Sequence, residues 1–119
     1  MNACTDNKVF EIVKSFHFWA TRQLIAADGT TKEMYGAGWK GRVRCKGPSG
    51  LLENDMLVPF GEINTVIAKL HEKDLNTVLN TTQPTVEYVA AWILDQVPFA
   101  VEVELAISGD HLVVVSHQQ

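Results

Sequence analysis

The sequence predicts an α+β domain in which an antiparallel four-stranded sheet carries two helices on one face, in the order ββααββ. Three observations lead to this prediction. Apolar and polar residues alternate, with the period of strands, in two stretches before residue 50 and two after residue 99. Between them, apolar residues recur at helical spacing in two further stretches. Turn-forming residues separate the strands of each pair, which favours two hairpins.

The first two strands are expected over Val9 to Trp19 and from about Tyr35 to Lys46, around turn residues at 26–30. The first strand has one strongly apolar face, formed by Phe10, Ile12, Phe16 and Phe18. From Trp39 onward the second strand alternates cleanly. Its polar face carries Lys40, Arg42, Arg44 and Lys46. Turn residues at 47–50 end this strand.

A helical stripe runs from Phe60 to Leu70, and a second one lies between Pro84 and Val97. Pro84 suits the first helical position, because its fixed φ is already helical and its missing N–H would be unpaired there. Glu87 is expected in the first turn, where a carboxylate meets the positive end of the helix dipole. The second helix therefore has a defined start.

The last two strands are expected over Ala100 to Ile107 and Leu112 to His117, joined by a tight turn at 108–110. Val101, Val103 and Leu105 should face the helices. If the second and third strands are neighbours, Arg42 and Arg44 lie across from Glu102 and Glu104. Such opposite charges favour the pairing by ~0.2–1 kcal/mol each.

Length and composition indicate one globular domain over residues 1–119. A net charge of −4 gives no general attraction to nucleic acid or anionic membranes. No apolar run approaches the ~20 residues of a membrane helix, and the stretch from Met1 to Lys8 lacks a signal-peptide core. Cys4 and Cys45 lie far apart without a CxxC pair, so neither a disulfide nor a structural zinc site is expected. We expect a cytoplasmic protein.

Residues 36–41 spell GxGxxG, the pattern of dinucleotide-binding loops. That motif requires a preceding strand and a helix that begins within it, so that the helix N-terminus meets the pyrophosphate. Here a strand follows instead. The glycines are therefore interpreted as positions of close packing or of a bulge.

Several segments together resemble the family of 6-pyruvoyl-tetrahydropterin synthase and 6-carboxytetrahydropterin synthase, from Phe16 to Val115. The resemblance implies a T-fold, which has the same ββααββ order. It rests on Phe18 to Leu24 for the family's FxAxHRL, Tyr35 to Trp39 for HGHxY, Val58 to Ile63 for DFxxL with Pro59 in place of Asp, Leu70 with Leu75-Asn76 for LDHxxLN, and Pro84-Thr85-Val86-Glu87 with Ala90 for PTxEN…A.

Departures from the family's motifs affect its chemistry. The family binds a catalytic zinc through three histidines, and Arg22, Tyr35 and Ala37 stand at those positions. A protonated arginine has no lone pair to donate and alanine has no ligand atom, so neither a metal nor another cofactor is expected. The family's Asp-His pair becomes His71-Glu72.

Two further family residues are also missing. No cysteine lies in residues 30–34, where the family's nucleophile is expected, and Cys45 is too far along the strand to replace it. The glutamate that anchors the pterin falls on Leu105, although a register shift would offer Glu104.

The remaining polar residues allow functional and structural interpretations. Arg22 could stabilise an enolate or oxyanion in place of the metal, or form a structural ion pair. Tyr35 could donate a proton or pack as an aromatic side chain. His71 and Glu72 could act as acid and base, or be solvated at a helix end. Trp19 and Trp39 could form walls of a pocket for a flat substrate, or belong to the core. The substrate-binding candidates are Trp19, Ala37, Trp39, Thr85, Glu87 and Leu105.

Three hypotheses of function follow. The leading one is a metal-independent T-fold enzyme, of the cyclase, lyase or isomerase type, that acts on a small metabolite in a biosynthetic pathway through Arg22, Tyr35, His71 and Glu72. The second is a non-catalytic homologue that binds a ligand or another protein. The third is a zinc-dependent pterin or deazapurine synthase with relocated ligands.

The resemblance also implies that the sheets join edge to edge into a barrel. Closure would remove the unpaired edges of an open sheet. We therefore expect a homo-oligomer, a trimer or a hexamer, with the charged sheet face lining a tunnel. A solvated outer face on a monomer is the alternative.

Overall fold

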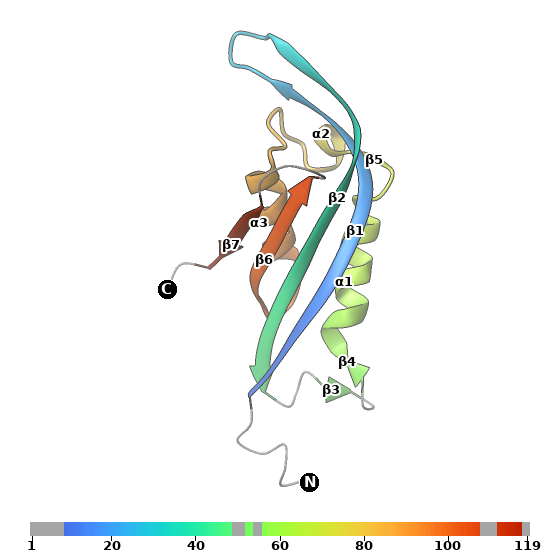
Figure 1. The fold of residues 1–119 in the computed structure, drawn as a ribbon, viewed down its shortest axis with the longest axis vertical. Helices are drawn as coiled ribbons and strands as arrows, with labels where there is room; N and C mark the ends of the chain where they lie inside the picture. Colours follow the sequence, from blue (N-terminus) through green and yellow to red (C-terminus); the bar gives the residue numbers. More distant parts are fainter. Residues whose placement is uncertain (1–8, 49–51, 54–55, 108–111, 118–119) are drawn as a thin grey trace, which may run out of the picture.

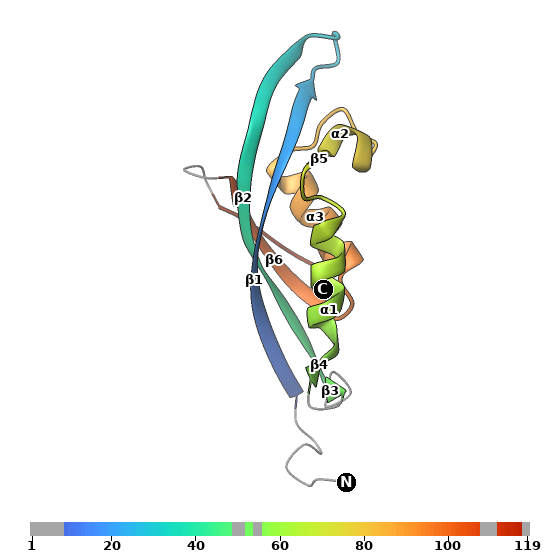
Figure 2. The same cartoon turned by 90° about the vertical axis from the view of Figure 1, so that its right-hand side faces the viewer.

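The computed structural model describes residues 9–48, 52–53, 56–107 and 112–117. Within them, one five-stranded sheet in the order β5-β1-β2-β6-β7 carries the helices on one face (Figures 1 and 2). The α+β prediction is confirmed, but the two residues of β5 add a fifth strand, parallel to β1, to the four antiparallel strands that were predicted. The sheet contains β1 (Val9–Ile25), β2 (Thr31–Pro48), β5 (Lys73–Asp74), β6 (Ala100–Ile107) and β7 (Val113–Ser116). The other elements are α1 (Val58–Ala68), α2 (Leu75–Val78), α3 (Val86–Gln96) and a separate pair, β3 (Leu52–Glu53) and β4 (Met56–Leu57).

The β1–β2 hairpin is longer than its alternation pattern predicts. β1 continues to Ile25 and β2 begins at Thr31, so the hairpin reaches beyond the other strands (Figure 1). At its tip the Asp28 carboxylate accepts a hydrogen bond of 2.9 Å from the Thr30 N–H, and Gly29 has a φ of 87°. These turn residues occur where the sequence predicts them. The predicted turn at 108–110 and Cys4 lie outside the described residues.

The core lies between the helices and the inner face of the sheet. Phe18, Trp39 and Val43 are completely or almost completely buried against apolar residues of α1 and α3. On the outer face, Arg42 pairs with Glu104 (Nε–Oε2 2.6 Å) and Arg44 with Glu102 (Nε–Oε1 3.5 Å), which confirms the predicted neighbours. Among the described residues, no helix is long and apolar enough to cross a membrane.

Two details of the strand faces differ from the prediction. The β2–β6 register shifts between Arg44 and Cys45, so that Val101 is an extra residue in the ladder and is only half buried. Ala100 enters the core instead. On β1, Lys14 lies across from the core residue Val43 and interrupts the apolar face. A bulge and a single inward lysine therefore modify an otherwise regular alternation.

The GxGxxG segment, Gly36 to Gly41, lies entirely within β2. The close-packing interpretation is confirmed at Gly41, where a Cβ would contact the Glu104 carbonyl oxygen and come within 2.6 Å of Phe16 Cζ. At Gly36 a Cβ would come within 2.7 Å of Trp19 Nε1. Gly41 therefore lacks room for a side chain, whereas a side chain at Gly36 would require the exposed Trp19 indole to move.

Helix α3 begins at Val86, two residues later than expected. Thr85 is its N-cap, with an extended backbone and a hydroxyl that accepts a hydrogen bond from the Tyr88 N–H at 3.1 Å. The prediction of Pro84 at the first helical position was wrong, because the threonine supplies the capping oxygen and proline precedes it. Glu87 lies in the first turn, as predicted.

The edge of β1 that faces away from β2 is hydrogen-bonded only between Trp19 and Ile25. The Asn76 side chain acts like a short strand there, since Oδ1 accepts from the Gln23 N–H and Nδ2 donates to the Gln23 carbonyl, both at 2.8 Å. The Ile25 N–H donates to the Thr82 carbonyl at 2.9 Å. By contrast, the backbone groups that point away from β2 at Val9, Glu11, Val13, Ser15 and His17 have no backbone partner among the described residues.

Candidate functional site

Arg22 is buried on the helix side of the sheet, immediately after the irregularity between Ala20 and Arg22 in β1. Its side chain is 8% exposed. Nη1 donates a 2.8 Å hydrogen bond to the Pro84 carbonyl, and the guanidinium lies 5.0 Å from the ring centroid of Trp39. Arg22 thus connects β1 both to β2 and to the segment that leads into α3. An arginine is suited to this position because its planar cation can stack and donate at once.

Trp39 belongs to an aromatic stack in the core. Its ring centroid lies 5.6 Å from that of Phe18, which lies 6.3 Å from that of Phe16. The indole of Trp39 is completely buried, and its Nε1–H has no hydrogen-bond acceptor among the described residues. An unpaired buried donor costs about 1–3 kcal/mol. The stack therefore contains an unsatisfied donor beside a buried cation.

His71 and Glu72 form an oriented pair where α1 meets the edge of β1. The Trp19 N–H donates to His71 Nδ1 at 3.1 Å, and the Glu72 N–H donates to the Trp19 carbonyl at 2.6 Å. Because Nδ1 accepts, the proton of a neutral imidazole lies on Nε2. Nε2 is 3.6 Å from Glu72 Oε1, and the two side chains are 49% and 76% exposed. The φ of 61° at Glu72 turns the chain toward β5.

A hollow of about 400 Å³ lies between β1 and α1, beside this pair. His71 and Ile67 line it from the helix side, and Lys14 and His17 line it from β1. Sequence reasoning missed Lys14, although a lysine in an apolar strand face was a visible signal. The hollow therefore combines cationic, imidazole and apolar groups.

The other candidates lie in different surroundings. Trp19 is exposed next to His71, whereas Leu105 is completely buried in the core. Ala37 is half buried across from Ala20. Thr85 is engaged as the N-cap of α3, where Glu87 is exposed in the first turn. Tyr35 lies on β2, but its side chain is outside the described part of the structure.

The candidates thus form two groups, both close to residues 19–22 of β1. Arg22, Trp39 and Thr85 lie on the helix side of the sheet, and His71, Glu72 and Trp19 lie at its edge. Neither of the two described hollows is lined by Arg22.

The family model of 6-pyruvoyl tetrahydropterin synthase matches residues 11–111. The chain belongs to the 6-pyruvoyl tetrahydropterin synthase family. The structure of Caenorhabditis elegans 6-pyruvoyl tetrahydropterin synthase is similar at a TM-score of 0.69 and 11% identity, covering 93% of this chain and 97% of that one. At this identity the likeness shows the T-fold alone. Among curated proteins, no match was found.

Zinc is the metal that the 6-pyruvoyl tetrahydropterin synthase family implies, and the residues at the corresponding positions do not fit it. The Arg22 guanidinium is a permanent cation that already donates to the Pro84 carbonyl, and Ala37 has no donor atom. Within the described residues, no group of three His, Cys, Asp or Glu side chains is placed to hold a metal ion. No catalytic step is therefore assigned to a metal.

Cys45 does not replace the missing nucleophile of this family. It pairs with Ile12 on β1 and with Ala100 on β6, far along β2 from Tyr35. Burial raises the pKa of the Cys45 thiol to about 11. The thiol is therefore protonated at neutral pH, and a buried thiol is a poor nucleophile.

Proposed function

We propose that this family member is a metal-independent enzyme that acts by acid–base chemistry on a small, carbonyl-bearing metabolite in a biosynthetic pathway. The reaction would be of the cyclase, lyase or isomerase type. The observation that carries this proposal is the fixed His71 imidazole, which is oriented by the Trp19 N–H, faces the Glu72 carboxylate and borders a hollow. A general acid or base must be oriented within reach of the group with which it exchanges a proton.

In this proposal the substrate occupies the hollow between β1 and α1. The Glu72 carboxylate removes a proton from the carbon next to the substrate carbonyl, and the Nε2–H of His71 donates to the carbonyl oxygen. Lys14 and His17, which also line the hollow, would stabilise the negative charge that develops on the carbonyl oxygen. Tyr35 remains a candidate proton donor.

In this proposal Arg22 does not stabilise an enolate or oxyanion, which is the role that the leading sequence hypothesis gave it. Its guanidinium already binds the Pro84 carbonyl and stacks on Trp39. We therefore assign it a positioning role, in which it fixes the start of α3 and supplies a permanent positive charge behind the aromatic stack.

Hydrogen–deuterium exchange can test the acid–base proposal without a known product. The protein, treated with a chelator, is incubated in D₂O with a panel of small keto acids and ketones, and loss of C–H signals is followed by NMR. We expect at least one compound to exchange, because reversible proton abstraction replaces H by D. Exchange should fall at least ~10²-fold in His71→Ala and in Glu72→Gln, the usual size of a general acid–base contribution.

His117→Ala is the matched control, since His117 is exposed and makes no hydrogen bond to a described residue. Its exchange rate should equal that of the unmodified protein. Unchanged rates in both His71→Ala and Glu72→Gln would remove the pair from the mechanism. Loss of exchange on chelation, restored by zinc, would favour the zinc-dependent alternative.

A non-catalytic ligand-binding role is the second candidate. It is favoured by the buried Nε1–H of Trp39, which has no acceptor in the described part of the chain and lies beside the Arg22 cation. A ligand oxygen could accept from such a donor. A metabolite that co-purifies with the protein and shows no exchange in D₂O would support this role over catalysis.

We also propose that the single domain formed by residues 1–119 assembles as a trimer or hexamer through its sheet edges. Between Val9 and His17 the edge of β1 has backbone groups without a partner among the described residues, and an edge strand of another chain could form hydrogen bonds with them. Light scattering should therefore give three or six times the monomer mass. Val13→Pro should shift the population toward monomer, because it removes an N–H that points away from β2. A folded monomer at low micromolar concentration would contradict the assembly.

A further inference from the structure

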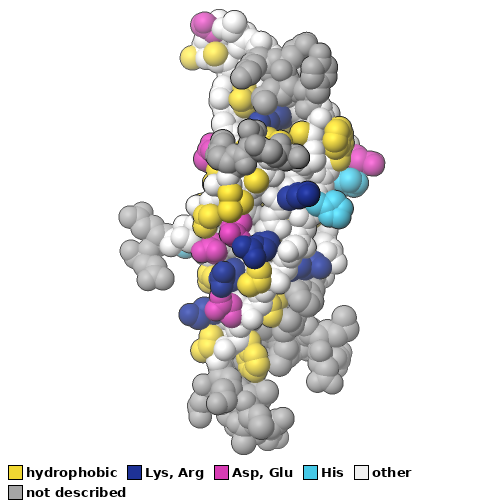
Figure 3. All heavy atoms as spheres, in the orientation of Figure 1, with side chains coloured by type: hydrophobic (Ala, Val, Ile, Leu, Met, Phe, Trp, Pro, Cys, Tyr) yellow, Lys and Arg dark blue, Asp and Glu magenta, His cyan; other side chains and the backbone are white. Residues whose placement is uncertain are grey.

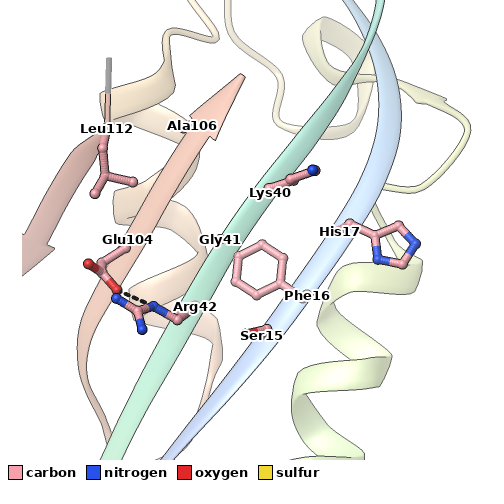
Figure 4. Close-up of a pocket in the computed structure, with 9 residues that line it drawn as sticks. All are labelled: Ser15, Phe16, His17, Lys40, Gly41, Arg42, Glu104, Ala106 and Leu112. Carbon is pink, nitrogen blue, oxygen red and sulfur yellow. Dashed lines mark hydrogen bonds and ion pairs between the residues drawn. The ribbon is translucent and has the colours of Figure 1, made fainter. Parts of the chain in front are cut away.

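The sheet face opposite the helices carries a second hollow, of about 470 Å³. It is centred on β2, and Figure 4 shows side chains that enter it from three neighbouring strands. His17 and Lys40 lie at one end, and the ion pair of Arg42 with Glu104 lies at the other. In Figure 3, Lys and Arg side chains gather over the middle of this face. The hollow lies on the opposite side of the sheet from buried Arg22.

Hydrogen-bond donors exceed acceptors in this hollow. Glu104 is its only carboxylate among the described lining residues, and it is occupied by Arg42 Nε at 2.6 Å. The terminal nitrogens of Arg42 and the ammonium of Lys40 make no hydrogen bond or ion pair with any described residue. Because the pair of Arg42 and Glu104 is neutral overall, Lys40 leaves one positive charge in excess. The site is thus complementary to a single anionic group.

The rest of the lining is apolar and flat. Ala106 and the exposed side chain of Leu112 lie beside the charged groups, and Gly41 leaves the strand without a side chain at the centre. The ring of Phe16 also borders the hollow there. A planar apolar group can lie on such a surface while its anionic end reaches Lys40.

We propose that this hollow binds a small molecule that carries one carboxylate or phosphate group on a flat apolar part. Lys40 binds the anionic group at its end of the hollow, and Leu112 with Ala106 contacts the apolar part. The site borders the acid–base hollow and shares His17 with it, but the groups proposed to bind the ligand, Lys40, Leu112 and Ala106, have no part in the proposed acid–base function. In a closed barrel it would face the tunnel, so that ligands would reach it from the tunnel mouth.

Four probes separate the parts of this proposal in a calorimetric or NMR titration of the full chain. Benzoate and phenyl phosphate carry both the ring and the anion. Benzamide lacks the charge, and inorganic phosphate lacks the ring. We expect saturable binding of benzoate or phenyl phosphate, whichever anion the natural ligand carries, and at least ~10-fold weaker binding of benzamide and inorganic phosphate.

Lys40→Gln should weaken the binding of the preferred probe about tenfold, because it removes the excess charge and its hydrogen bonds. Lys46→Gln is the matched control, since Lys46 lies exposed on the same face of β2 but outside the hollow. It should leave the affinity unchanged. Equal binding of benzoate and benzamide, no saturable binding of any probe, or equal losses in both lysine variants would each overturn the proposal.

Discussion

Gly41→Ala should lower the free energy of unfolding by about 3 kcal/mol, at the upper end of overpacking effects. A Cβ at this position would overlap the Glu104 carbonyl oxygen, a backbone atom that cannot move without opening the β2–β6 ladder. It would also lie 2.6 Å from Phe16 Cζ, in the aromatic stack. Denaturant unfolding followed by tryptophan fluorescence measures the loss.

Gly38→Ala is the matched control for this prediction. Gly38 lies on the same strand, and a Cβ there would meet no other atom within 4 Å. Its free energy of unfolding should change by at most about 0.5 kcal/mol. Equal losses in the two variants would mean that strand glycines act through chain entropy and not through the close approach of β6.

Arg22→Ala should also destabilise the fold by about 3 kcal/mol. The substitution removes a hydrogen bond from a charged donor, worth about 1.5–3 kcal/mol, and a cation–π contact that is desolvated. It also leaves the Pro84 carbonyl without this donor. The thermal or denaturant transition of the variant measures the effect directly.

Arg42→Ala is the control for Arg22. Arg42 lies on the outer face with a half-exposed side chain, and its ion pair with Glu104 should contribute no more than about 1 kcal/mol. If Arg22→Ala kept the full stability but lost proton exchange, Arg22 would be a catalytic residue and not an anchor. The two variants therefore separate the two interpretations that the sequence left open.

Periodicity predicted the four antiparallel strands β1, β2, β6 and β7 and the helices α1 and α3, because buried residues recur in each at a regular spacing. The bulge at Val101 and the N-cap at Thr85 break that regularity. The bulge depends on the β2–β6 register, which no local pattern shows, whereas the N-cap depends on a local hydrogen bond from the Tyr88 N–H to Thr85 that the prediction for Pro84 overlooked. The pairing of Asn76 with Gln23 spans 53 positions and was likewise not predicted.

The candidate site was predictable in part. The positions of Arg22 and His71 followed from the family resemblance, but their environments did not. Whether a guanidinium faces a ligand or a carbonyl depends on the path of the chain at Pro84. Whether an imidazole is solvated or fixed depends on the backbone of Trp19. Lys14 became a candidate only when α1 was placed beside β1.

The half-paired edge of β1 limits how another strand can add to it. A strand that joins β1 can form hydrogen bonds only with backbone groups between Val9 and His17. The next outward-facing groups, the N–H and carbonyl of Trp19, are already bound to His71 and Glu72. Sliding the added strand toward Ile25 would require those hydrogen bonds to break first. The chain's own contacts thus set an end point for the pairing of any strand that extends the sheet on this side.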